Sequence, residues 1–178
     1  GGAAFASRVT KTEGMNRFVW DVRHQNGLGA PPGAYQVRVT IDGKPFVQPL
    51  TVHVDPQLAA EGLTAADLQA QFDHNVRMRE LVAAVNQVVT RVRQTQTQLK
   101  SGTGADAEKA RKVDAIAAQL LTENVRYGKP GLQAHITYLA GMTTGADQKV
   151  GKDALDRYLV LKKELDAIIA QLDQLIGK

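Results

Sequence analysis

The chain of 178 residues has no cysteine, only 5% aromatic residues, and no apolar run of the roughly 18 residues that a membrane-spanning helix needs. The missing cysteines exclude disulfide bonds and thiolate zinc sites. The missing apolar run predicts that the chain has no membrane span. With 43% hydrophobic and 22% charged residues, the composition is nevertheless typical of a folded protein.

The net charge of +4 makes the chain mildly basic, and acidic and basic residues alternate along its helical part. The longest predicted helix carries the basic residues Arg77, Arg79, Arg91, Arg93 and Lys100. Because these residues project in several directions and no exposed aromatic residues lie between them, we predict no nucleic-acid binding. A nucleic-acid or anionic-surface binder is the alternative, and it requires binding that weakens steeply with added salt.

Residues 35–54 show the alternation of a β-hairpin. From Tyr35 to Ile41 every second side chain is apolar, which is typical of a half-buried strand. Asp42-Gly43 follows, a dipeptide that accepts the positive φ of a tight turn, and the alternation resumes at residues 50–54. Pro45 and Pro49 cannot donate ladder hydrogen bonds, so we expect this half of the return strand at a sheet edge or with a bulge.

Two further strands are predicted before the hairpin. Phe18, Trp20 and Val22 share one face of a third strand, and Phe5 to Val9 supply a fourth. A complete immunoglobulin-like sandwich has about seven strands. We therefore predict a partial immunoglobulin-like β-sandwich over residues 1–56.

Trp20 has two interpretations, a carbohydrate platform or a core anchor. Its place in the alternation with Phe18 and Val22 favours the core, because large aromatic residues dominate the cores of small domains.

Residues 63–178 carry helical periodicity and predict an antiparallel bundle of three long helices plus one short helix, so the fold class is α+β. Thr64 and Asp67 resemble a capping box at the start of a helix that runs to about residue 100. The later helices are expected at residues 106–125, at residues 132–142 and from about residue 152 to the end. The predicted core positions are Met78, Leu81, Val82, Val85, Val88, Val89, Val92, Leu99, Val113, Ile116, Leu120, Leu121, Leu132, Ile136, Leu139, Leu155, Leu161, Leu165, Ile168, Leu172 and Leu175.

No catalytic motif is readable in the sequence. The four histidines, His24, His53, His74 and His135, lack the i, i+3 or i, i+4 spacing that places two metal ligands on one helical face. Asp73 and His74 are adjacent on a helix and diverge by about 100°, so we expect both to face solvent rather than to form an acid/base pair. We therefore assign no catalytic, cofactor-binding or metal-binding residues, and we predict no cofactor.

Three segments are similar to a known family. These are Gly14–Arg23 (GMNRFVWDVR), Ala30–Arg38 (APPGAYQVR) and Gln48–Val52 followed by Asp55-Pro56. They resemble the C-terminal region of bacterial exported sortilin-like proteins, which carry Asp-box (BNR) repeats and are often labelled glycosyl-hydrolase-like. Asp67–Phe72 (DLQAQF) also fits the helical tail of that family.

The resemblance implies a large β-propeller before this region, an immunoglobulin-like sandwich, a helical tail and a periplasmic or secreted location. We expect any signal peptide to have been removed or to lie upstream of this chain. No Asp-box motif of the form Ser-x-Asp-x-Gly-x-Thr-Trp occurs here, so no catalytic residue is carried over from the family.

The sequence therefore predicts a non-catalytic accessory or interaction module of a larger exported β-propeller protein, serving packing, assembly or partner binding. The expected partners are the upstream propeller, another protein, or a second copy bound through the β part. The alternative is part of a glycosyl-hydrolase-like or carbohydrate-binding protein whose active site lies outside this chain. Exposed, coplanar aromatic rings would favour that alternative, and the candidates are Trp20, Tyr35, Tyr127 and Tyr138.

Overall fold

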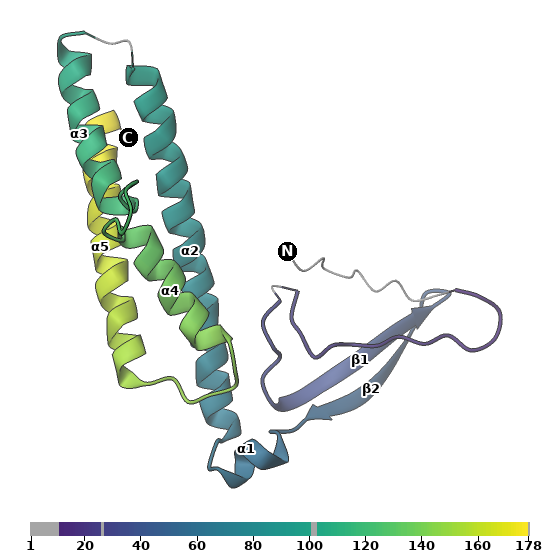
Figure 1. Cartoon of the computed structure of the whole chain (residues 1–178). Coiled ribbons are helices and arrows are strands. Elements are labelled where there is room, and N and C mark those ends of the chain that lie inside the picture. Colours follow the sequence, from purple (N-terminus) through teal and green to yellow (C-terminus); the bar gives the residue numbers. More distant parts are fainter. Residues whose placement is uncertain (1–10, 26, 101–102, 178) are drawn as a thin grey trace. The chain divides into compact units, whose positions relative to one another are not determined.

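The computed structural model describes residues 11–25, 27–100 and 103–177. Within these residues the chain is α+β and mostly helical, with one two-stranded antiparallel sheet and five helices (Figure 1). It divides into two compact units, Gly1–Phe72 and Asp73–Lys178, which we call the hairpin unit and the helical unit. The boundary falls inside a long helix, because that helix starts in the first unit and supplies much of the core of the second.

The predicted hairpin is confirmed. Strand β1 (Gly33–Ile41) pairs antiparallel with β2 (Lys44–Val52), and Asp42 and Gly43 form the turn with φ of 49° and 79°. The pairing runs without interruption from Ile41 and Lys44 to Gly33 and Val52, so the return strand has no bulge. Both strands are edge strands of the described two-stranded sheet, as the prolines of β2 require.

The predicted third strand is wrong. Residues 14–23 form no strand, and their one ladder contact is an isolated bridge between Arg23 and Gly29. Phe18 and Val22 are exposed, and Val22 has a φ of 57°, which breaks the extended conformation. Alternation identifies a strand only where a neighbouring strand accepts its hydrogen bonds, and none does so here among the described residues. The predicted fourth strand, Phe5 to Val9, lies outside the described residues.

Two helices begin at capped residues. The short helix α1 (Pro56–Ala60), which we did not predict, begins after Asp55, whose carboxylate accepts from the Gln57 amide at 2.8 Å. The long helix α2 (Ala65–Leu99) follows the predicted capping box. There the Asp67 amide donates to the Thr64 hydroxyl at 3.1 Å, and the Thr64 amide donates to the Asp67 carboxylate at 3.1 Å. The reciprocal pair satisfies two amides that the helix leaves free.

Three more helices complete the helical unit, α3 (Ala105–Leu120), α4 (Leu132–Thr144) and α5 (Lys152–Ile176). In Figure 1, α2 and α5 run in one direction, and α3 and α4 run in the other. Helix α3 ends five residues before its predicted end, at Leu120, because Leu121 is extended and residues 122–131 form a loop closed on itself. In that loop Glu123 accepts from the Lys129 amide through its carboxylate and donates its own amide to the Lys129 carbonyl.

The apolar stripes of α2, α3, α4 and α5 share one core, largely as predicted. The prediction for Leu155 is wrong, because this residue is exposed on α5. Ala154 and Tyr158 pack against the core at this end of the helix instead. Val82, Leu99, Leu121 and Leu175 are only partly buried. No helix in the described ranges has both the length and the apolar character to cross a membrane.

Candidate functional site

The hairpin has one apolar face and one polar face. The register places Tyr35 opposite Leu50 and Val39 opposite Phe46 on the apolar face. Val37 and Ile41 lie on the same face, opposite Gln48 and Lys44, which are its polar residues. The opposite face carries Gln36, Arg38, Thr40, Pro45, Val47, Pro49 and Thr51. The two strands therefore form an amphipathic ribbon.

The apolar face is exposed to solvent along most of its length. Val37, Val39 and Ile41 are 45%, 48% and 57% exposed, and Phe46 is 56% exposed. The prediction of a half-buried strand is therefore wrong for the described structure, since only Tyr35 of β1 is partly buried. Exposed contiguous apolar surface marks interaction sites in soluble proteins, so this face is the candidate functional site.

Trp20 covers one end of this face. Its ring lies 5.5 Å from the ring of Tyr35 at an interplanar angle of 60°, and its indole N–H donates to the Arg23 carbonyl at 2.8 Å. The Tyr35 hydroxyl donates to the Pro31 carbonyl at 2.6 Å. Trp20 is thus a half-buried packing residue, and the tilt between the two rings does not give the flat platform that binds a sugar.

The other candidate aromatic residues do not join this pair. Tyr127 is 90% exposed in the loop after α3, where the Arg126 guanidinium lies 5.2 Å from its ring centre. Tyr138 is 70% exposed on α4. No coplanar aromatic cluster forms among the described residues that were candidates for carbohydrate binding.

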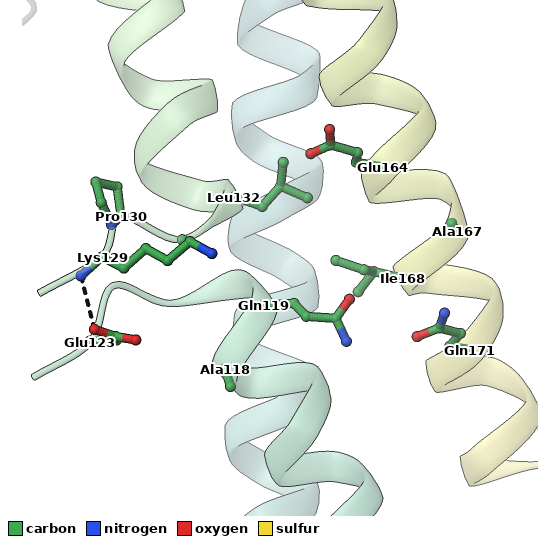
Figure 2. A pocket seen from close by; sticks show the side chains of 11 residues that line it. Ala118, Gln119, Glu123, Lys129, Pro130, Leu132, Glu164, Ala167, Ile168 and Gln171 are labelled. Carbon is green, nitrogen blue, oxygen red and sulfur yellow. Dashed lines mark hydrogen bonds between the residues drawn. The ribbon is translucent and has the colours of Figure 1, made fainter.

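A hollow of about 480 Å³ lies in the helical unit, and Figure 2 shows the side chains that line it. It lies between the end of α3, the loop before α4, and α5. Gln119, Glu164 and Gln171 supply polar side chains, and Glu123 is bonded to the Lys129 backbone at its rim. The lining residues include two carboxylates, Glu123 and Glu164, and no histidine, serine, threonine or tyrosine.

A second hollow of about 370 Å³ lies between α4 and the start of α5. His135 lines it, together with Tyr138, Met142, Asp153 and Arg157. In the described part of the chain, no three histidine, aspartate or glutamate side chains converge in the manner of a metal site.

His74 contradicts its predicted exposure. Its side chain is 0% exposed, and neither imidazole nitrogen has a hydrogen-bond partner. The neighbouring Asn75 donates to the Thr143 carbonyl at 3.0 Å, while its own side-chain oxygen is unpartnered. Burial, and secondarily the Arg77 charge, lower the pKa of His74. The residue type concealed this burial, but the spacing carried a signal for it: His74 stands one turn before Met78, on the face that continues as the apolar stripe of α2.

The remaining histidines and the basic residues named from the sequence do not form a common site. His24 lies against Phe72 with ring centres 4.8 Å apart, and His53 is exposed. Of the basic residues on α2, Arg91 pairs with Asp173 of α5 and Arg77 lies over the Tyr158 ring at 5.5 Å. Arg79, Arg93 and Lys100 are exposed. Two of these five basic side chains are therefore engaged in contacts within the helical unit.

Comparison with protein-family models, curated proteins and solved structures gives no match to this chain. The assignment of a function therefore depends on the surface chemistry described above.

Proposed function

We propose that this chain is a non-catalytic interaction module of a larger exported β-propeller protein, and that its role is packing, assembly or partner binding. The hairpin contributes to an immunoglobulin-like sandwich, and α2 to α5 form an antiparallel bundle of three long helices and one short helix. The proposed location is periplasmic or secreted. The sequence resemblance to sortilin-like Asp-box proteins supports the family assignment.

The exposed apolar face of the hairpin is the observation that carries the proposal. In an immunoglobulin-like sandwich, the inner face of each sheet packs on the other sheet. Val39 and Phe46 form a cross-strand pair on this face, next to the central pair of Val37 and Gln48, and both are about half exposed. A second sheet packed on them removes this apolar surface from water, which is the main favourable contribution to association.

The test of the module uses two matched substitutions on neighbouring residues of β1. Val39→Asp places a charge on the apolar face, and Thr40→Asp places the same charge on the polar face. The polypeptide encoded upstream of Gly1 is produced separately and mixed with each chain, and binding is measured by calorimetry. We expect binding by the parent chain and by Thr40→Asp, and loss of binding by Val39→Asp.

Three results would contradict the proposal. An upstream coding region without Asp-box repeats contradicts the propeller assignment. Equal binding by both variants contradicts the role of the apolar face. Hydrolysis of glycosides or esters by the purified chain, abolished by one substitution within it, contradicts the non-catalytic role.

A further inference from the structure

The two edges of the hairpin differ in their capacity to accept another strand. In a hairpin with a two-residue turn, the pair that flanks the turn exchanges both hydrogen bonds, and the pairs then alternate. Ile41 and Lys44 flank the turn here. The odd-numbered residues of β1 therefore bond to β2, and the even-numbered residues direct their N–H and C=O groups outward.

The outer edge of β2 is poorly suited to strand addition. Pro45 and Pro49 stand opposite Thr40 and Gln36, at positions whose backbone groups point away from β1. Neither proline has an N–H, so they weaken no bond within the hairpin and remove two donors from the outer edge. Proline at a sheet edge is a common barrier to strand pairing.

The outer edge of β1 has no such barrier. Ala34, Gln36, Arg38 and Thr40 each present one N–H and one C=O outward, and all four residues are exposed. Within the described residues, no backbone hydrogen bond reaches this edge, and β1 is the last strand of the sheet there. A two-stranded hairpin is marginally stable by itself, so a third strand at this edge stabilises it.

We propose that β1 pairs antiparallel with β1 of a second copy of this chain, about a two-fold axis at Val37. This register places Gln36 opposite Arg38 of the second copy, and Ala34 opposite Thr40. The outward groups of all four residues then pair in both copies. On the other face, Tyr35 lies opposite Val39 of the second copy, an aromatic and β-branched pair that favours sheet formation.

The two neighbouring registers that keep outward groups paired are less favourable. One places Arg38 directly opposite Arg38 of the second copy, and like charges at opposed positions are destabilising. The other places Gln36 opposite Gln36 and leaves Thr40 opposite Pro32, which precedes β1 and has no N–H. The register centred on Val37 avoids both defects and keeps the apolar faces of both hairpins on the same side of one four-stranded sheet.

A cysteine at the axis tests the register, and the absence of native cysteine makes the result unambiguous. Val37 forms a non-hydrogen-bonded pair with itself in the dimer, where Cα atoms lie about 4.5 Å apart, within the range for a disulfide. We expect Val37→Cys in the full chain to form a disulfide-linked dimer on mild oxidation. Gln48→Cys is the control, because Gln48 adjoins Val37 on β2 but lies two strands further from its equivalent in the second copy.

A pair of proline substitutions tests the edge. Arg38 and Val47 are directly opposed, and both direct their backbone groups away from the hairpin. Sedimentation equilibrium of the full chain should show a reversible dimer. Arg38→Pro should raise the dissociation constant of the dimer about tenfold or more, because proline has no N–H and each copy then loses the hydrogen bond that the Arg38 N–H donates to the other copy. Val47→Pro and the charge control Arg38→Ala should leave the dissociation constant unchanged.

Three results would overturn the dimer: a monomeric parent chain at all accessible concentrations, a dimer equally weakened by Arg38→Pro and Val47→Pro, or equal cross-linking of the two cysteine variants. The edge of β1 and the apolar face are separate surfaces. A monomeric chain would therefore leave the proposed packing of the apolar face untouched.

Discussion

The buried imidazole of His74 meets the ring of Tyr158 edge-on, with ring centres 5.9 Å apart and an interplanar angle of 71°. The Arg77 guanidinium lies 5.5 Å from the same tyrosine ring. His74 is thus enclosed beside an aromatic ring and near a positive charge, without a hydrogen-bond partner for either nitrogen. Burial and the Arg77 charge both disfavour the protonated imidazole.

The first prediction concerns pH. The pKa of His74 is lowered in the folded chain, first by burial and then by Arg77. The unfolded chain therefore binds this proton more readily, and the stability contribution is present above the unfolded pKa of about 6.5 and is lost as pH falls below it. We expect the urea midpoint to decrease between about pH 7 and pH 5, and His74→Phe to reduce that decrease. Parallel pH profiles for the two chains would contradict the assignment.

The second prediction concerns the cover over the hairpin face. Tyr35→Ala removes the ring on which Trp20 packs, so the emission of the sole tryptophan should shift to longer wavelength. The loss of unfolding free energy should be smaller than that for a fully buried aromatic residue, about 3–5 kcal/mol, because both rings are only partly buried. Tyr35→Phe keeps the ring and loses only the bond to the Pro31 carbonyl, so its emission should stay close to that of the parent. An unchanged emission in Tyr35→Ala would show that the two rings do not pack in solution.

The third prediction concerns Gly131, the residue before α4. A Cβ atom at this position would lie 2.5 Å from the Leu120 carbonyl oxygen. A side chain there would therefore force the C-terminal end of α3 and the start of α4 apart. We expect Gly131→Ala to destabilise the helical unit by about 2 kcal/mol or more. The urea transition followed by circular dichroism at a helical wavelength measures this effect.

Gly141→Ala is the matched control on the same helix. Nothing lies within 4 Å of the added Cβ atom there, and alanine favours the helix interior. We expect this substitution to stabilise the unit by about 0.5–1 kcal/mol. Similar destabilisation by both substitutions would mean that the close approach at Gly131 does not exist.

The fourth prediction concerns the start of α2. Thr64→Ala removes the hydroxyl that accepts from the Asp67 amide, and it should lower the free energy of unfolding by about 1 kcal/mol. Thr90→Ala is the comparison, since its hydroxyl bonds only to the Asn86 carbonyl within the same helix. Because alanine is the better helix former, that second change should be neutral or slightly stabilising. Hydrogen exchange in the first turn of α2 would locate the effect, and equal protection in both variants would argue against the capping box.

The sequence predicted the elements whose signal is local. Asp42-Gly43 between two alternating runs determined the hairpin and its register, because a two-residue turn permits one pairing. Thr64 and Asp67 located the start of α2 through bonds within four residues. The spacing of Met78, Val85 and Val92 determined which side of α2 is buried, since residues at this spacing share one face.

Only the tertiary structure decided what contacts each face. The alternation around Trp20 predicted a strand, but residues 14–23 lack a described strand partner, and the tryptophan packs on Tyr35 instead. His74 is polar by type yet enclosed, while Val39 and Phe46 are apolar by type yet exposed. Periodicity specifies the direction of a side chain relative to its own backbone. Whether that side chain is buried depends on atoms contributed by distant segments, and this is why the sequence by itself left the burial of Trp20, His74 and the hairpin face undetermined.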